Sequence, residues 1–389
     1  MTAVKRIGIL TGGGDVPGLN VAIKAAVMRG LDYSIEVVGL RRGWMSVLTI
    51  DPDDPASVAQ WTWPLSRDVV RTFDRTGGTL LHSSRTNPSS VKPGDVPACV
   101  NTADQQPAGG GRIDCTKHAL RVLAALGLDA LIAIGGDDTL SFANRLHREG
   151  FKVCGIPKTM DNDVFGTDYC IGFSTAVTRS VDALVALRTP LGSHERIGVI
   201  ELFGRNSGAT SFYSGYLAAV DRILIAEVPF DIAHLAELLA ADRERNPSHY
   251  AMVTVSEGAQ ILGGEIVESG DADAYGHKKL GGIGQQVAAE IKRRTKINIM
   301  YQQLGYVMRS GPPDTLDRMV ASTFGLMAMD QCAAGQTGNM VAVQNGTCAV
   351  CSLDKVVAGK KTVDVANLYD SENYCAKVHT GVGRGMFPV

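Results

Sequence analysis

The stretch Arg6–Asn20 reads RIGILTGGGDVPGLN and decides the fold, because an apolar run leads into three glycines and then into a helical pattern. A short β-branched run followed by a turn and a helix is typical of a β-α unit in an α/β protein. Glycines at such a turn also let backbone N–H groups and the helix N-terminus face an anion, which predicts a phosphate site. The spacing matches neither the GxxxxGK[ST] nor the GxGxxG motif. A tight packing turn without a ligand is the alternative.

The same alternation of apolar runs and helical patterns continues along the chain. Strands are predicted at 6–10, 36–40, 130–134, 152–156, 196–202, 223–228, 251–256, 304–308 and 340–343. Helices are predicted at 18–29, 114–126, 174–187, 232–245, 281–294 and 315–333. Right-handed helical crossovers between parallel strands give a doubly wound α/β sheet, which binds ligands beyond the carboxyl ends of its strands. The segment from Thr86 to Arg112 is rich in proline and glycine and is predicted to be a long loop.

The composition excludes several classes of protein. The chain of 389 residues is 45% hydrophobic and 20% charged, which rules out a disordered protein. The 38 Lys and Arg residues nearly balance the 40 Asp and Glu residues, so no overall charge favours nucleic acid or a membrane surface. The apolar runs are far shorter than the ~20 residues that cross a bilayer, and we expect a cytoplasmic protein. Cys348 and Cys351 have C-x-x-C spacing without a second pair, which favours a buried structural role.

A pair of adjacent carboxylates follows the predicted strand at 130–134. Asp137 and Asp138 stand in the sequence GGDDT, directly before a helical pattern. Carboxylates at a strand end suit a hard cation such as Mg²⁺, whose other ligands would be water and phosphate oxygens. Capping of the helix by an Asp is the alternative, and it accounts for one of the two residues more easily than for both.

The strand predicted at 152–156 runs into PKTMDND, where a cation, a hydroxyl and two carboxylates fall within six residues. These are Lys158, Thr159, Asp161 and Asp163. Together they could supply a phosphate clamp and a general base. The carboxyl ends of parallel strands meet at one edge of a sheet. The three polar loops are therefore predicted to line a single crevice.

Five motifs together give the sequence a resemblance to the phosphofructokinase family. They are TGGGDVPGLN, GGDDT, PKTMDND, SHERIGVIELFGRNSG and LGYVMRSG, in the order and approximate spacing of that family. The match extends from Ile7 to about Asn345 and so covers most of the chain. Kinases that phosphorylate NAD share a G-G-D sequence, but that similarity leaves three of the five motifs unexplained.

The resemblance implies two doubly wound, Rossmann-like α/β lobes with the active site in the cleft between them. The phosphoryl-donor lobe would hold residues 1–172 and about 310–360, and the sugar-phosphate lobe residues 173–309 and about 361–389. The implied reaction transfers a phosphoryl group to the 1-hydroxyl of fructose 6-phosphate. A homo-oligomer is also implied, most simply an isologous dimer.

The resemblance also implies roles for individual residues. Asp161 looks like the base that takes the sugar hydroxyl proton, with Thr159 and Asp163 beside it, and Asp137 looks like the carboxylate linked to Mg²⁺. Gly13, and Arg85 in GGTLLHSSR, would hold the transferring phosphoryl group. The sugar-phosphate contacts implied in addition are Met160, Arg196, Phe203, Gly204, Arg205, Glu257, Tyr306, Val307, Met308 and Arg309.

Two positions indicate the phosphoryl donor. ATP-dependent members of the family carry Gly where this chain has Asp138, and commonly Gly where it has Lys158, whereas pyrophosphate-dependent members resemble this sequence at both. A carboxylate at position 138 would repel the α-phosphate of a nucleotide, and Lys158 would neutralise the small, highly charged pyrophosphate. We therefore expect a reversible, pyrophosphate-dependent enzyme. An ATP-dependent 6-phosphofructokinase and a catalytically silent homologue are the alternatives.

The sequence departs from the family at several positions. Met300 stands where the resemblance implies a second arginine donated across a subunit interface. That leaves Arg196 as the expected ligand from a partner subunit, with Lys296 as a possible substitute. Phe203 replaces the usual Met, and Ser310 replaces the usual Gly beside Arg309. Basic residues of the family's effector site are only partly retained, so strong allosteric control is not expected.

Overall fold

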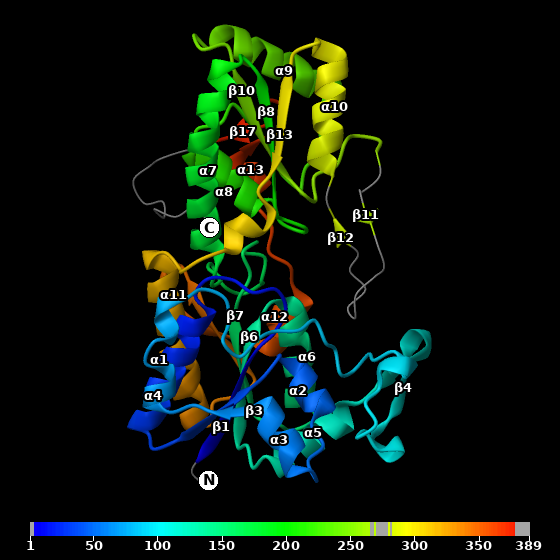
Figure 1. Cartoon of the computed structure of the whole chain (residues 1–389), viewed down its shortest axis with the longest axis vertical. Coiled ribbons are helices and arrows are strands. Elements are labelled where there is room, and N and C mark those ends of the chain that lie inside the picture. Colours follow the sequence, from blue (N-terminus) through cyan, green and yellow to red (C-terminus); the bar gives the residue numbers. More distant parts are fainter. Residues whose placement is uncertain (1–3, 265–267, 270–278, 281, 378–389) are drawn as a thin grey trace.

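The structure is a computed structural model that describes residues 4–264, 268–269, 279–280 and 282–377. It consists of two α/β lobes stacked along the long axis of the molecule, each built on its own sheet (Figure 1). The first sheet has the strand order β15-β14-β7-β6-β1-β2-β3, and the second has the order β13-β8-β10-β9. The chain thus has the doubly wound two-lobed architecture that was expected.

The first sheet is formed by strands from both ends of the chain. Its strands are β1 (Arg6–Thr11), β2 (Glu36–Leu40), β3 (Thr62–Pro64), β6 (Ala130–Gly135), β7 (Val153–Pro157), β14 (Asn339–Gln344) and β15 (Thr347–Ser352). Its helices are α1 (Leu19–Asp32), α2 (Trp44–Thr49), α3 (Pro55–Trp61), α4 (Arg67–Val70), α5 (Thr116–Ala125), α6 (Asp137–Arg148), α11 (Thr315–Ala333) and α12 (Leu353–Ala358). Helices α1 and α11 cover one face, and α5 and α6 cover the other (Figure 1).

The second sheet is entirely parallel. Its strands are β8 (Ile197–Leu202), β9 (Arg222–Leu224), β10 (Ala251–Ser256) and β13 (Ile299–Gln303). Its helices are α7 (Phe173–Ser193), α8 (Ala209–Leu217), α9 (Ile232–Arg245) and α10 (Ile283–Thr295). The remaining elements are short: β4 (Gln106–Ala108), β5 (Arg112–Asp114), β11 (Glu268–Ser269), β12 (Lys279–Leu280), α13 (Val365–Leu368), β16 (Tyr369–Asp370) and β17 (Cys375–Ala376).

The strand order of the first sheet reverses between β1 and β6. Strand β1 pairs in parallel with β2 on one side and with β6 on the other. Helix α1 leads from β1 towards β2, whereas α6 leads from β6 to β7 in the opposite direction. The loops after β1 and β6 therefore separate at this point, and a crevice opens at their carboxyl ends, as in other doubly wound sheets.

Most strands and helices predicted from the sequence are confirmed, with shifts of a few residues at their ends. The strand predicted at 304–308 is wrong: residues Gly305–Arg309 form a 3₁₀ turn, and the strand is β13 just before it. The backbone at Gly305 takes a φ of 47°, a left-handed value that ends the extended run. The strand predicted at 223–228 is shorter, because β9 ends at Leu224. Thr86 to Arg112 is a long excursion with only short turns and β4, as expected.

Two further predictions concern the cysteines and the membrane. Cys351 is buried and Cys348 is exposed, and both are free thiols in β15, so the buried role holds for one of the pair. No helix in the described part of the chain is both long and apolar enough to span a membrane.

Helices α1 and α11 pack at unusually close range. A Cβ atom on Gly325 of α11 would lie 2.8 Å from the Cβ of Ala25 and closer still to the carbonyl oxygen of Ala22. Both neighbours belong to α1 and are fixed by helical backbone. Only glycine allows this approach, which holds α1 and the loop before it against the first sheet.

Gly325→Ala should destabilise the protein, because α1 and α11 would have to move apart. Overpacking of this kind costs about 1–3 kcal/mol of unfolding free energy. Gly192→Ala, near the end of α7, is the matched control, since its Cβ would lie 3.5 Å from the Tyr250 ring in ordinary contact. Thermal unfolding followed by circular dichroism should show a lower melting temperature for Gly325→Ala only. Equal melting temperatures for the two variants would contradict the packing argument.

Candidate active site

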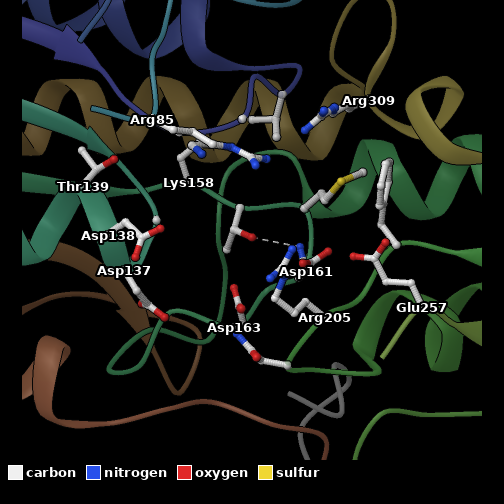
Figure 2. Close-up of a pocket in the computed structure, with 18 of the residues that line it drawn as sticks. Arg85, Asp137, Asp138, Thr139, Lys158, Asp161, Asp163, Arg205, Glu257 and Arg309 are labelled. Carbon is white, nitrogen blue, oxygen red and sulfur yellow. Dashed lines mark hydrogen bonds between the residues drawn. The ribbon is translucent and has the colours of Figure 1, made fainter. Parts of the chain in front are cut away.

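A cavity of about 640 Å³ lies between the two lobes, where the carboxyl ends of both sheets meet (Figure 2). From the first lobe it is lined by the loops after β1, β6 and β7. From the second lobe it is lined by the segments after β8, β10 and β13. The three polar loops predicted to share a crevice are therefore brought together.

The loop after β1 shapes the cavity because its glycines carry no side chains. The N–H groups of Gly12 and Gly13 donate to the carbonyl oxygens of Ile134 and Ser84, at 2.9 and 3.0 Å. The prediction that these amides face an anion is therefore wrong for both residues. Gly13 has a φ of 79°, and a Cβ there would lie 3.2 Å from Nζ of Lys158. Its role in the structure is to let the Lys158 ammonium group approach the loop.

Three cationic side chains lie near the glycine loop after β1, and we call Arg85, Lys158 and Arg309 the basic cluster. Lys158 is only 4% exposed. Burial lowers the pKa of Lys158 to about 8, the charges of Arg309 and Arg85 add to that shift, and Asp163 opposes it. A lysine that is buried among like charges is stabilised when an anion binds beside it. The basic cluster is therefore suited to a small polyanion.

Asp137 and Asp138 occupy the first turn of α6, next to the basic cluster. The residue that caps this helix is Gly136, without a side-chain hydrogen bond, so neither Asp acts as the cap. Oδ1 of Asp137 is buried and has no hydrogen-bond partner among the described residues. The pKa of Asp137 is raised to about 7, mainly by burial and also by the charges of Asp163 and Asp138, whereas Lys360 and Lys158 oppose the shift.

These carboxylates fit a magnesium ion that a phosphate compound brings with it. No group of three or more His, Cys, Asp or Glu side chains in the described ranges is arranged to hold a metal by itself. Mg²⁺ is commonly held by one or two carboxylates together with phosphate oxygens and water. The unpartnered Oδ1 of Asp137 matches that kind of donor set.

Asp161 lies between the two halves of the cavity, on the loop after β7. Its backbone N–H donates to Oγ1 of Thr159 at 3.1 Å (Figure 2). Its Oδ1 is buried without a hydrogen-bond partner in the described parts of the chain. Burial holds the pKa of Asp161 well above its usual range, and the charges of Asp163 and Glu257 add to this, while a backbone hydrogen bond from Arg205 opposes it. A carboxylate in such surroundings binds a proton readily, as a general base must.

The loop that carries Asp161 is fixed from both lobes. Oγ1 of Thr210, on α8, donates to the carbonyl oxygen of Met160 at 3.1 Å. The side chain of Asn162 donates to the carbonyl of Asp168 at 3.1 Å and accepts from the N–H of Cys170 at 2.9 Å. Asn162 itself adopts a φ of 51°, which asparagine tolerates better than most residues. The position of Asp161 therefore depends on both lobes.

The other half of the cavity carries Phe203, Arg205, Glu257 and Tyr306. Burial raises the pKa of Glu257 to about 7, while the charge of Arg205 opposes that shift. The guanidinium carbon of Arg309 lies 4.6 Å from the centre of the Tyr306 ring and 5.4 Å from that of Phe203. The two rings therefore hold Arg309 by cation–π contacts, so Phe203 and Tyr306 both support the same arginine.

Arg309 also reaches the first lobe. A Cβ on Gly14 would lie 2.5 Å from Nη1 of Arg309, and Nε of Arg309 lies 3.7 Å from Oδ1 of Asp15. The arginine therefore spans from the aromatic pair in the second lobe to the glycine loop in the first. A ligand that binds Arg309 is placed close to both lobes at once.

Four of the residues implied by the resemblance do not line this cavity. Gly204 accepts a hydrogen bond from Oγ of Ser256 at 2.6 Å and serves the backbone turn. Met308 is buried in the core, and Val307 is 58% exposed, because the 3₁₀ turn directs them away. Arg196 precedes β8, at the end of the sheet opposite the cavity. The other implied residues all line the cavity.

Some lining residues were missed from the sequence. Gly14, Val16, Thr139 and Asn206 stand inside the motifs but were not singled out. Gln303 precedes a segment that was predicted to be a strand. Lys360 belongs to a polar stretch without any motif, so the sequence gave no reason to select it.

Comparison with known proteins agrees with this geometry. The family model described as Phosphofructokinase matches residues 6–332. A pyrophosphate–fructose 6-phosphate 1-phosphotransferase of Amycolatopsis methanolica is 38% identical over 369 residues, which cover 94% of this chain and 98% of that protein. An ATP-dependent 6-phosphofructokinase 3 of Streptomyces coelicolor is 34% identical, with 94% and 99% covered.

Solved structures show the same fold. The crystal structure of a pyrophosphate-dependent phosphofructokinase from Marinobacter aquaeolei superposes with a TM-score of 0.74 at 18% identity, covering 96% of this chain and 89% of that one. The phosphofructokinase of Pichia pastoris gives a TM-score of 0.74 at 22% identity, covering 92% of this chain and 36% of that one.

Gly14→Ala should displace Arg309 and weaken anion binding with little loss of stability. The new Cβ meets only the end of a flexible arginine, which can move aside. We expect the Kd for pyrophosphate, used as a polyanion probe in calorimetry, to rise about tenfold, the worth of one charge-assisted hydrogen bond. Gly109→Ala, which would meet nothing within 4 Å, is the control. A Kd for Gly14→Ala within twofold of the control value would show that Arg309 does not support the anion site.

Proposed function

The chain belongs to the phosphofructokinase family, and on that premise we propose that it transfers a phosphoryl group from pyrophosphate to the 1-hydroxyl of fructose 6-phosphate. The products would be fructose 1,6-bisphosphate and inorganic phosphate, and the reaction would run in both directions. Four relatives that are 37–39% identical over 94% of the chain are named for this activity.

One observation carries the proposal: the buried, unpartnered Oδ1 of Asp161 stands between the basic cluster and Arg205 with Glu257. A donor phosphate beside Lys158 and a sugar beside Glu257 would meet at this carboxylate. Holding both substrates next to each other in the reactive orientation lowers the entropic part of the activation barrier.

The proposed chemistry is a single displacement at phosphorus. The 1-hydroxyl oxygen of the sugar forms a bond to the terminal phosphorus of pyrophosphate while the bridging P–O bond breaks, and the bridging oxygen leaves with phosphate. Oδ1 of Asp161 takes the hydroxyl proton. In the reverse direction the protonated Asp161 returns that proton to the sugar oxygen. The raised pKa of Asp161 suits the role of base, because it increases the affinity of the carboxylate for the hydroxyl proton.

The cationic side chains would stabilise the negative charge of the transferring group. Phosphoryl transfer depends mainly on alignment and on neutralisation of the charge on the phosphate oxygens. Lys158 and Arg85 are held beside the glycine loop before any ligand binds, so little reorganisation would be needed. Arg205 would bind the phosphate group of the sugar, since arginine forms paired hydrogen bonds with phosphate. Arg309, which spans from the aromatic pair to the glycine loop, would contact both substrates.

We also propose that the reaction uses Mg²⁺, with Asp137 as its protein ligand and Asp138 and Asp163 nearby. Bound there with the donor, the ion would neutralise charge on the phosphate oxygens of pyrophosphate. The two buried carboxylates Asp137 and Asp163, whose pKa values are both raised by burial, would be relieved of mutual repulsion by a cation.

Asp138 supports pyrophosphate over ATP as the donor. It lines the cavity in the first turn of α6, beside Asp137. A second negative charge at this point would repel the additional phosphate of a nucleotide. Relatives named as ATP-dependent are also similar, at 34% identity, so the donor is the part of the proposal that needs the first test.

We further propose that the active enzyme is a homo-oligomer located in the cytoplasm. Arg196 lies at the end of β8 remote from the cavity of its own chain, which suits donation to a partner subunit. Met300, in β13, pairs with Gly198 in β8 close to that end of the sheet, and Lys296 lies just before β13. Lys296 could therefore reach the same neighbouring site as Arg196.

Initial rates with each donor should separate the two candidate activities. With Mg²⁺ and fructose 6-phosphate, nucleotide-free protein should form fructose 1,6-bisphosphate with pyrophosphate and not with ATP. Asp138→Gly should lower the inhibition constant for ATP, because the repelling charge is removed. Turnover with ATP alone would overturn the donor assignment, and an unchanged inhibition constant would count against the role of Asp138.

Asp161→Asn should lower kcat by ~10²–10⁴, the usual contribution of a positioned base. In the wild type, Asp161 must be deprotonated for the forward reaction. Because its pKa is raised, forward kcat/KM should fall as the pH drops through that value, and the reverse reaction should instead weaken as the pH rises through it. The variant should not show this fall at low pH, the acidic limb of the pH profile, while it should still bind pyrophosphate. Asp182→Asn on the exposed side of α7 is the control and should keep the wild-type profile.

Near-normal turnover in Asp161→Asn would remove this residue from the role of base. A lowered kcat with an unchanged acidic limb would instead assign that limb to another group in the cavity.

A further inference from the structure

Lys360 enters the cavity from a part of the chain that the mechanism above does not use. It follows α12 and lines the same cavity as Asp137 and Asp138. We call the part of the cavity that holds Lys158, Asp137 and Asp138 the donor half. It lies outside the residues 6–332 matched by the family model. We propose that Lys360 binds the phosphate group of pyrophosphate that leaves after the transfer, and the inorganic phosphate that takes its place in the reverse reaction. This inference rests on the proposed function.

The backbone on both sides of Lys360 is fixed, although its own side chain is exposed to the cavity. A Cβ on Gly359 would collide with the ring of Phe165, so the chain passes directly over that ring. The N–H of Lys361 donates to the carbonyl oxygen of Asp163 at 3.3 Å, and its Nζ donates to the carbonyl oxygen of Asp168 at 2.6 Å. Lys360 is therefore held beside the loop that carries Asp161.

The next residues tie the segment to the second lobe. The N–H of Val363 donates to Oε1 of Glu227 at 2.8 Å, and the same carboxylate accepts from the N–H of Gly208 at 3.0 Å. On the other side, Asp354 in α12 accepts from the side chain of Asn144 in α6 at 3.0 Å. Lys360 thus stands where the chain passes from the first lobe to the second.

The position of Lys360 in the cavity indicates which phosphate group of pyrophosphate it would bind. Asp137 and Asp138 lie on the opposite side of Asp161 from Glu257 (Figure 2). The charge of Lys360 is among those that act on Asp137, so the ammonium group is near the far end of the donor half. The transferring phosphoryl group must lie close to Asp161 and Lys158. The leaving phosphate then extends towards Asp137 and Lys360.

The charges in the donor half favour a cation in addition to Lys158, close to the leaving phosphate. Asp137, Asp138 and Asp163 contribute three carboxylates, and Lys158 lies over Gly13 beside the transferring group. Apart from a bound Mg²⁺, a released phosphate would face these carboxylates, and Lys360 would supply additional positive charge there. Lysine is suited to this position, because its ammonium group acts as a mobile point charge and can follow the departing ion.

The test compares Lys360→Met with Lys355→Met, an exposed lysine of α12 that does not line the cavity. At saturating Mg²⁺, Lys360→Met should raise the KM for pyrophosphate about tenfold and raise the KM for phosphate in the reverse direction similarly. The KM values for the two fructose phosphates should stay within twofold of wild type. Lys360→Arg should recover part of the loss, and Lys355→Met should match the wild type. Melting temperatures establish that all variants fold.

Two results would overturn the inference. One is a KM for pyrophosphate and for phosphate within twofold of wild type in Lys360→Met. The other is an increased Mg²⁺ requirement with an unchanged KM for pyrophosphate, which would make Lys360 a partner of the metal site. Should the wild type use ATP only, the proposed function fails and the leaving group is ADP. The KM for ATP in the same variants then decides whether Lys360 binds the leaving group: a rise supports that role, and no change removes it.

Discussion

The buried carboxylate of Asp317 holds together the parts of the molecule on which the active site depends. It lies on α11, fully excluded from solvent, and accepts from the hydroxyl of Tyr169, from the N–H groups of Gly172 and Thr175 and from the hydroxyl of Thr175. Burial raises the pKa of Asp317 to about 6, and its hydrogen bonds from Thr175 and Gly172 offset part of the cost of burying this carboxylate. Because Tyr169 and Gly172 end the loop that begins at Lys158, one side chain fixes both the loop that carries Asp161 and the start of α7, and through α7 the second lobe.

Without ligands, several ionisable groups in the cavity lie in surroundings that disfavour their charged forms. Burial raises the pKa values of Asp137, Asp161 and Glu257 and lowers that of Lys158, so groups of both signs are held away from their preferred charge states. A polyanion brought by a divalent cation would satisfy both sets at once, since the cation offsets the carboxylates and the anion offsets the basic cluster.

Much of the fold and of the site could be predicted from the sequence, because strand ends in a doubly wound sheet carry the ligand-binding loops. The apolar runs of β1, β6 and β7 predicted the edge at which GGGD, GGDD and PKTMDND would meet. Local patterns did not predict the 3₁₀ turn at Gly305–Arg309, because its apolar residues resemble those of a strand. The contact of Arg309 with the Tyr306 ring is seen only in the folded structure. Nor did local patterns predict the Gly13 amide bonded to Ser84, or Lys360, since both depend on contacts between segments far apart in the chain.

The lowered pKa of Lys158 has a thermodynamic consequence for ligand binding. With a pKa of about 8 in the free protein, a fraction of the Lys158 side chains is neutral in mildly alkaline solution. An anion beside the ammonium group raises that pKa again, so binding takes up protons from the buffer. Affinity for an anion at this position must then weaken as the pH rises through 8, and the heat of binding must vary with the ionisation enthalpy of the buffer. Burial of one lysine in this way links the occupancy of the cavity to the proton concentration outside it.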